Sequence, residues 1–416
     1  MKKLNNLDIK NFGPIREAHL SFGDLTILIG PQASGKSLAL QLLKLLLDGP
    51  FVISIMEQYN FVIGKNPDNI LNFYFGEGLS ELWTTDTQIY YDFNSFTKKE
   101  LQNYIYNVEK ERKRFTKQLC LDLGEFTSFI PIPSITEHLF YIPAQRIISI
   151  ADGRPKNFIE YDSSTPFILR QFSEILRMYF LYGFSGNKVV FPLKNRLKGG
   201  IKKAFQNSVF HNGKVIIDDS SGQKKMQLSI DSLNIPFMAW SAGQKEFMPL
   251  LMAFYCLSGP SQKVVDHRQF HYVVLEEPEM GLHPKALQSV LLQIIELMQN
   301  GYKVIVSTHS QVLLEFAWAF NTIKASNIQK ELKEKMLQRM FGLEKFETCI
   351  GIIKNVFEKS ISTYYFNDQG KGVETRDISD LNVASDDQNM ANWGGLSQFS
   401  DKASEIVSQV INGEYE

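Results

Sequence analysis

The fold of this chain is decided by residues 25–43, which read LTILI, GPQASGKS and LALQLL in succession. A short apolar run typical of a buried strand leads into an eight-residue loop, and an apolar helical run follows. The loop has the spacing G-x-x-x-x-G-K-S, in which backbone N–H groups and the helix start cradle phosphate oxygens while the lysine opposes their charge. We expect a nucleotide phosphate to lie against Gly30, Pro31, Gln32, Ala33, Ser34, Gly35, Lys36, Ser37 and Leu38.

A pair of glutamates ends a second apolar run much further along the chain. Residues 270–275 read FHYVVL, and Glu276 and Glu277 follow directly, with Pro278 closing the segment. A carboxylate at the end of a buried strand can complete a Mg²⁺ shell with Ser37, and its neighbour can orient an attacking water. We assign Glu276 to the metal and Glu277 to the water. The alternative is that the pair belongs to a solvated helix face.

A second anion site is indicated at residues 240–246, which read WSAGQKE. The apolar stretch after them predicts a helix whose N-cap is Ser241. A serine hydroxyl, a glycine amide and a helix N-terminus can hold a terminal phosphate without a lysine. The residues of this site are Ser241, Ala242, Gly243 and Gln244. A similar string, SSGQKK at residues 220–225, precedes a period-two stretch and is interpreted as a hairpin turn.

A histidine follows another predicted buried strand, at residues 304–310, which read VIVSTHS. One predicted helix, from Pro284 to Asn300, separates this strand from the strand that ends at Glu276. The two strands should therefore lie side by side in a parallel sheet, with both ends at one edge. His309 would then reach the terminal phosphate. The alternative is a structural histidine.

These four motifs, in this order, resemble those of ABC-type ATPase heads, and more narrowly the branch that includes RecF, the SMC proteins and the OLD-like ATPases. The runs LDIKNFGPI (7–15) and LEEPEMGLHP (275–284) look most like OLD-like ATPases of the anti-phage systems PARIS and Septu. The resemblance implies an α/β ATPase head with a mixed or parallel core sheet, an N-terminal antiparallel β part and an inserted, mainly helical region. It implies ATP and Mg²⁺ as cofactors, and a signature that acts in trans on ATP held by a second protomer.

The family also senses Mg²⁺ with a strand-end glutamine, for which Gln145 in FYIPAQR (140–146) is the candidate. The alternative is that Gln145 and Arg146 are ordinary surface residues. Three positions depart from the family pattern: Gln32 stands where Asn is common, Ala242 replaces a glycine, and Glu276 stands where many relatives have Asp. None removes a needed functional group, although the longer carboxylate at 276 would shift Mg²⁺ outward and slow turnover.

The composition is that of an ordinary folded protein, with 416 residues, 44% hydrophobic residues and a formal net charge of −1. This length suits one elaborated domain or two. We expect no membrane span, because Lys44 interrupts the longest apolar run, and no signal-peptide core follows the first residues. Three widely spaced cysteines, Cys120, Cys256 and Cys349, exclude a zinc hook and fit a reducing compartment. We therefore expect a cytoplasmic protein.

The chain is divided by its motifs into four parts. Residues 1–50 carry the N-terminal strands and the phosphate loop, and residues 51–235 are an insertion from which a strand near 139–146 returns to the core. Residues 236–320 carry the signature, the glutamates and His309, and residues 321–416 are a C-terminal α/β extension for partner or oligomer contact. Amphipathic helices are predicted at 98–122 and 167–184, hairpins at 214–230 and 363–377, and a last helix near 399–410.

The C-terminal part and two basic runs bear on nuclease and DNA-binding functions. OLD nucleases place a Toprim domain in the C-terminal part, with a glutamate and an Asp-x-Asp on successive strands, and this tail has neither at a strand end. Nuclease activity would then belong to a partner. Two basic runs, at 110–114 and 194–203, could contact DNA, and solvated helix faces are the alternative.

The sequence is therefore interpreted as an Mg²⁺-dependent ATPase that dimerises around ATP, with larger rings as a further assembly. It would control an effector nuclease or toxin in bacterial anti-phage defence. The alternatives are a RecF-like DNA-repair ATPase and an ATP-bound scaffold with little turnover that sequesters a toxin or nuclease. The intact Glu277 favours turnover.

Overall fold

A ten-stranded mixed sheet organises the part of the chain that the computed structural model describes, which is residues 5–62, 66–91, 94–101, 103, 136–184, 186–220, 222–262, 264–342, 351–368, 370–382, 385 and 388–412. Its strands, in spatial order, are β5 (Asn94–Phe96), β4 (Trp83–Tyr91), β1 (Asn6–Phe12), β2 (Ile15–Ser21), β16 (Val373–Asp377), β15 (Ile361–Asp368), β3 (Leu25–Ile29), β14 (Lys303–Ser307), β13 (Tyr272–Glu276) and β6 (Leu139–Ile142). This arrangement confirms the predicted α/β class.

The sheet has an antiparallel half and a parallel half. Strands β5, β4, β1 and β2 pair antiparallel, which confirms the predicted N-terminal antiparallel part. Strands β15, β3, β14, β13 and β6 all run parallel, and Glu276 pairs in register with Ser307. Because parallel strands end at the same edge, the phosphate loop, the glutamates and His309 leave the sheet side by side. The strand near 139–146 returns to the core as predicted.

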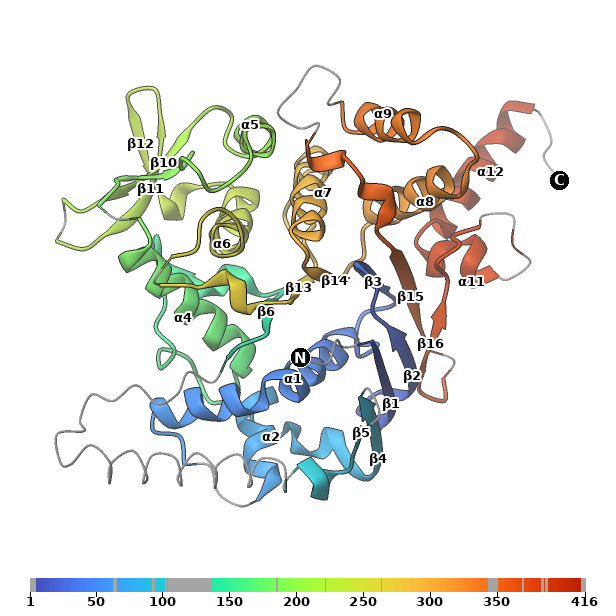
Figure 1. Ribbon diagram of the computed structural model, residues 1–416, viewed down its shortest axis with the longest axis horizontal. Helices are drawn as coiled ribbons and strands as arrows, with labels where there is room; N and C mark the ends of the chain where they lie inside the picture. Colours follow the sequence, from blue (N-terminus) through green and yellow to red (C-terminus); the bar gives the residue numbers. More distant parts are fainter. Residues whose placement is uncertain are drawn as a thin grey trace.

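The C-terminal hairpin is part of this central sheet. Strand β15 pairs in parallel with β3, with Ile361 opposite Leu25, and β16 pairs in parallel with β2. The predicted hairpin at 363–377 is confirmed, but a division of the chain at residue 320 does not follow the sheet. Strands β15 and β16 lie between the antiparallel half and the other strands of the parallel half (Figure 1).

Helices cover both faces of the parallel half. Helices α1 (Lys36–Gln58) and α2 (Pro67–Phe75) lie on one side, and α6 (Ala242–Leu257), α7 (Pro284–Gln299) and α8 (Gln311–Ala325) lie on the other (Figure 1). Strand residues alternate between the two cores: Ile27 faces α6 and α7, whereas Leu28 faces α1. Burial on both faces explains the unbroken apolar strands seen in the sequence.

The remaining elements lie around this core. The predicted helix at 167–184 is α4 (Phe167–Tyr182), and the last predicted helix is α12 (Gln398–Asn412). The others are α5 (Gly199–Ser208), α9 (Lys330–Met340) and the short α11 (Gln388–Ala391). Most of the helix predicted at 98–122, the basic run 110–114, Cys120, Cys349 and the acidic pair 386–387 lie outside the described residues.

A four-stranded antiparallel sheet forms the outer part of the insertion, so this region is less helical than expected. Its order is β12 (Leu233–Pro236), β11 (Lys225–Ile230), β10 (Lys214–Asp218) and β9 (Val189–Phe191). The hairpin predicted at 214–230 is confirmed as β10 and β11, and the SSGQKK string forms its turn, although Ser221 itself is not described. Two strands of two residues each, β7 (Ile150–Ala151) and β8 (Arg154–Pro155), pair antiparallel as a short ribbon, and the Met226 N–H of β11 donates to Gly153 in its turn.

Helix α1 carries a charged cluster in the interior. The ammonium of Lys44, 1% exposed, donates to Asp48 Oδ2 at 2.7 Å, Glu137 Oε1 at 2.7 Å and the carbonyl of Leu139 at 2.6 Å. The helix is kinked at Asp48, two residues before Pro50. By length and composition α1 is apolar enough to cross a membrane, contrary to the expectation from Lys44, but most of it is buried inside this protein as a core helix.

Candidate functional site

The phosphate loop is shaped by residues that need left-handed backbone. Gly30, Ala33 and Gly35 have φ values of 149°, 59° and 89°. A Cβ on Gly30 would lie 2.6 Å from the carbonyl oxygen of Phe366 in β15, so the loop needs glycine where the C-terminal hairpin packs on it. Helix α1 begins at Lys36, directly after Gly35, as predicted. The loop thus presents its N–H groups together with a helix N-terminus.

Lys36 folds back over the loop. Its ammonium donates to the carbonyls of Gly30 and Pro31 at 2.9 and 2.8 Å and to Ser34 Oγ at 3.2 Å. Burial lowers the pKa of Lys36 to about 8, while the negative charges of Glu277, Glu276 and Glu279 oppose the shift. A phosphate bound in the loop would replace these neutral partners with an anionic one.

Glu276 is the buried carboxylate of the site, at 3% exposure. Its Oε2 accepts from the Ala144 N–H at 3.1 Å, whereas Oε1 has no hydrogen-bond partner in the described part of the chain. Burial raises the pKa of this carboxyl, and the neighbouring Ser37 hydroxyl, the Ala144 N–H and the Tyr141 hydroxyl oppose the shift. A buried carboxylate oxygen without a partner is costly, and Mg²⁺ held between it, Ser37 and phosphate oxygens would satisfy it.

Glu277 lies at the mouth of the site with a strained backbone. Its φ is 41°, rare for a residue with a side chain, and its N–H donates to the Ser307 carbonyl at 2.8 Å. Its side chain is about a third exposed, and Oε1 lies 3.7 Å from His309 Nε2. The structure therefore brings Glu277 and His309 together at the ends of adjacent strands, as expected from the sequence.

Glu279 fixes the loop that carries the histidine. Its Oε1 accepts from Thr308 Oγ1 at 2.7 Å and from the His309 N–H at 2.5 Å, so it ties the two strand ends together. Burial raises the pKa of this carboxyl, and the two hydrogen bonds oppose the shift.

The signature forms the N-terminus of α6 with the predicted cap. Ser241 Oγ accepts from the Gln244 N–H at 3.3 Å, and Gln244 Oε1 accepts from the Ser241 N–H at 3.1 Å. This reciprocal capping box leaves Ser241 and Ala242 exposed. A Cβ on Gly243 would lie 2.6 Å from the Gly281 carbonyl oxygen, so the signature helix packs directly on the loop that follows Glu277.

Arg146 was missed by the sequence interpretation, which treated it as a surface residue. It is fully buried, and its guanidinium donates to three backbone carbonyls: Glu276 at 3.0 Å, Glu277 at 3.1 Å and Glu246 of α6 at 3.3 Å. The side chain thereby joins the glutamate strand to the signature helix. Gln145 is exposed at the same strand end, next to the Ala144 N–H that holds Glu276.

The residues of the site are better suited to a divalent cation bound together with a nucleotide than to a metal ion bound by protein side chains alone. Over the described ranges, no group of three or more His, Cys, Asp and Glu side chains could hold a metal ion. Mg²⁺ in nucleotide sites needs only one or two protein oxygens, because phosphates and water supply the rest.

Comparison with known proteins gives a family and several distant likenesses. A segment of 70 residues is 40% identical to the Old nuclease of Escherichia phage P2, and it covers 15% of this chain and only 12% of that protein. An SMC head domain from Thermotoga maritima covers 76% of this chain and 92% of its own, at 12% identity and a TM-score of 0.34. An SMC head bound to the C-winged helix domain of ScpA covers 90% and 97%, at 11% identity and a TM-score of 0.37.

A family model matches residues 25–315, which is well over half of the chain. The match begins at the strand before the phosphate loop and ends beyond His309, so it spans all four motifs. The chain therefore belongs to the P-loop ATPase family described as "AAA domain, putative AbiEii toxin, Type IV TA system".

Proposed function

We propose that this protein is an Mg²⁺-dependent ATPase. The observation that carries the proposal is the Glu276 carboxylate, buried at the end of β13 with one oxygen unpartnered among the described residues and the Ser37 hydroxyl beside it. Bound Mg²⁺ would draw charge from the terminal phosphates during transfer to water. This chain would hold the metal with Ser37 and Glu276, and Gln145 would reach it from the neighbouring strand end.

Each remaining residue then has a chemical role. Lys36 leaves the loop carbonyls and neutralises the β- and γ-phosphates, whose other oxygens meet the loop N–H groups. Glu277 accepts a hydrogen bond from the attacking water and holds it in line with the leaving group. His309, at 3.7 Å from Glu277, donates to the γ-phosphate or to that water. The Glu279 contacts keep His309 at this position.

We propose further that the site is completed by a second copy of the chain. Ser241 and Ala242 are exposed at a capped helix start, the geometry that binds an anion from outside the molecule. Two chains would then enclose two ATP molecules, with each signature against the γ-phosphate on its partner. ATP binding would close the dimer and hydrolysis would open it, which is a two-state switch.

The switch would control a partner protein in the cytoplasm. Support comes from the family description, which refers to a toxin of a toxin–antitoxin system, and from the short match to the Old nuclease. We propose an effector nuclease or toxin as the partner and anti-phage defence as the setting. A RecF-like DNA-repair role would instead require that DNA stimulate hydrolysis, and a static scaffold would require that ATP remain unhydrolysed.

The test separates binding from hydrolysis. Glu277→Gln should keep ATP affinity, because the residue does not ligate the metal, and lower turnover by about 10²–10⁴-fold, the span of a lost general base. Glu315→Gln, at an exposed position of α8, is the matched control and should leave turnover unchanged. Phosphate release and calorimetric ATP binding are measured on both. Equal turnover in the two variants would contradict the proposed role of Glu277.

A further inference from the structure

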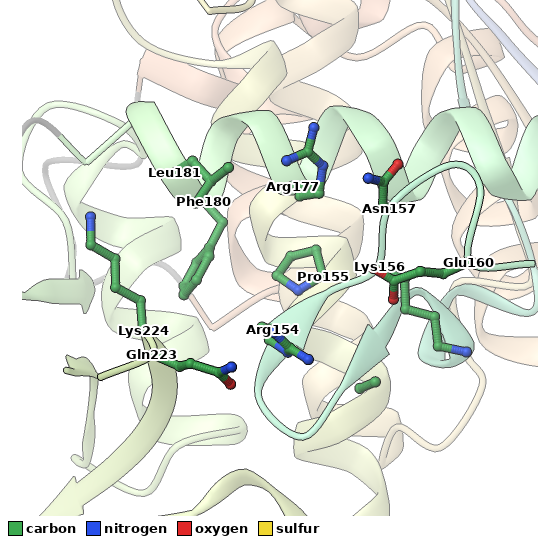
Figure 2. Close-up of a pocket in the computed structure, with 11 residues that line it drawn as sticks. Arg154, Pro155, Lys156, Asn157, Glu160, Arg177, Phe180, Leu181, Gln223 and Lys224 are labelled. Atoms are coloured by element: carbon green, nitrogen blue, oxygen red, sulfur yellow. The ribbon is translucent and has the colours of Figure 1, made fainter. Parts of the chain in front are cut away.

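A basic pocket of about 310 Å³ lies outside the nucleotide site, between α4, the β7–β8 ribbon and the turn of the β10–β11 hairpin (Figure 2). We call it the α4 pocket. Its cationic lining residues are Arg154, Lys156, Arg177 and Lys224, and its one lining carboxylate is Glu160. Its volume is at the lower end of the range of small-molecule sites.

The cations of the pocket differ in how far nearby carboxylates neutralise them, and the Asp219 carboxylate of the hairpin turn interacts with the charge of Lys224. Arg177 is held by Glu174 through a two-point contact, Nε to Oε2 at 2.9 Å and Nη2 to Oε1 at 2.6 Å. In the described part of the chain, the charged groups of Arg154 and Lys224 form no hydrogen bond or ion pair. The Lys156 ammonium lies 5.0 Å from the centre of the Tyr161 ring and contacts no carboxylate of the described residues. Among the described residues, Arg154, Lys156 and Lys224 thus line the rim of a pocket whose lining has a single acidic side chain, Glu160, and this excess of positive charge favours an anionic ligand.

The pocket is not a purely electrostatic surface. Figure 2 shows the Phe180 ring pointing from α4 toward Gln223 of the opposite turn, with Arg154 and Pro155 of the β7–β8 ribbon beside them. Phe180 and Pro155 are buried, so they present a firm apolar wall. The amides of Gln223 and Asn157 supply donors and acceptors at its edges. An apolar wall, two amides and free cations match a flat ring that carries a phosphate.

The walls of the pocket are joined by hydrogen bonds and an ion pair, so the pocket is formed without a ligand. The Met226 N–H of β11 donates to the Gly153 carbonyl at 2.8 Å, and Lys225 forms an ion pair with Asp152. On the other side, Ser173 Oγ of α4 donates to the Lys156 carbonyl at 2.8 Å. A preformed site loses less entropy on binding than one that must be ordered.

A short chain of contacts runs from this pocket to the nucleotide site. The Lys156 N–H donates to the Ser149 carbonyl at 2.8 Å, and Ser149 Oγ donates to the Arg146 carbonyl at 2.6 Å. The Arg146 guanidinium in turn holds the carbonyls of Glu276 and Glu277. A shift of the β7–β8 ribbon would therefore move Arg146 and, with it, the backbone of Glu277, which we propose orients the attacking water.

We propose that the α4 pocket binds a small nucleotide-sized organic phosphate, which regulates the ATPase through Arg146. The phosphate lies against Arg154 and Lys224, and the ring lies on Phe180 and Pro155. Binding at the pocket is independent of ATP hydrolysis, whereas the regulatory effect rests on the proposed function. Ribonucleoside 5′-monophosphates are suitable probes, because they lack the β-phosphate that the Lys36 loop holds.

The experiment is calorimetric titration of the full chain with AMP, GMP, CMP and UMP, and separately with inorganic phosphate and a single-stranded decanucleotide. At least one monophosphate should bind the wild type and the Lys36→Ala variant. Its Kd should rise by about tenfold or more in the double variant Arg154→Gln/Lys224→Gln, because two charge-assisted contacts are lost. Lys371→Glu, in the exposed β15–β16 turn, is the matched control and should bind like the wild type.

Several results would overturn the inference. They are binding of no monophosphate by the wild type, an unchanged Kd in the double variant, equal affinity for inorganic phosphate, or binding of the oligonucleotide alone. A thermal melt checks that the double variant is folded, and Phe180→Leu gives an independent second test, since loss of the ring should also weaken binding. For regulation, the bound monophosphate should change the ATP hydrolysis rate at least twofold in the wild type and not in the double variant. An unchanged rate in the wild type would remove the regulatory role and leave the binding site standing.

Discussion

Replacing Gly243 by alanine tests whether the signature helix positions the water-orienting glutamate. The added Cβ would lie 2.6 Å from the Gly281 carbonyl oxygen, whereas ordinary contacts begin near 3.4 Å, so the two segments must separate by about 0.8 Å. The loop from Glu277 to Gly281 is the movable part, because α6 is held by its core contacts. A misplacement of about 1 Å in a reacting group costs about 10²-fold in rate.

Two effects predict opposite changes in the stability of the Gly243→Ala protein. Helix propensity alone predicts that Gly243→Ala stabilises α6 by about 1 kcal/mol. The steric conflict predicts the opposite, a loss of about 1–3 kcal/mol, as for other overpacked sites. The assays are urea unfolding and steady-state ATP hydrolysis. Gly351→Ala is the control, because Gly351 is helical with open space at its Cβ and should be neutral or stabilising. A stabilised Gly243→Ala protein with turnover within twofold of the wild type would show that the contact between Gly243 and Gly281 does not position Glu277.

Two further predictions concern charged groups. Burial lowers the pKa of Lys36 to about 8, and ATP binds the protonated lysine, so ATP affinity should fall by up to tenfold per pH unit above pH 8. Calorimetry from pH 7 to 9.5 measures this affinity. An affinity that does not change over this pH range would contradict the prediction. Lys44→Met leaves Asp48 and Glu137 as buried carboxylates without their cation, so the free energy of unfolding should fall by about 3–5 kcal/mol. Urea unfolding measures this loss, and a change below about 1 kcal/mol would show that the cluster relaxes without Lys44.

Local signals in the sequence were sufficient to predict the local structure of the phosphate loop and the signature. The start of α1 at Lys36 depends on two glycines with left-handed backbone, and the start of α6 depends on a Ser241–Gln244 capping box. Both patterns are complete within a few residues. The parallel order of β14 and β13 also followed from the sequence, because one helix of suitable length connects them.

Non-local contacts could not be predicted in this way. Strand β15 pairs with β3 across more than three hundred residues, and its own sequence indicates only a hairpin. Arg146 and Lys44 have the side chains of surface residues, and each is buried because distant groups converge on it: three carbonyls for Arg146 and two carboxylates for Lys44. Only the folded chain places those partners together.

In the proposed switch, ATP joins two copies of this chain through the signature of each. The direct measurement is the sedimentation mass of the Glu277→Gln protein with and without MgATP. The expected mass is that of one 47.7 kDa chain without nucleotide and twice that mass with it. Ser241→Arg, added to Glu277→Gln, should keep ATP binding and abolish the doubling. A Glu277→Gln protein that binds MgATP and still sediments as a single chain would contradict the claim.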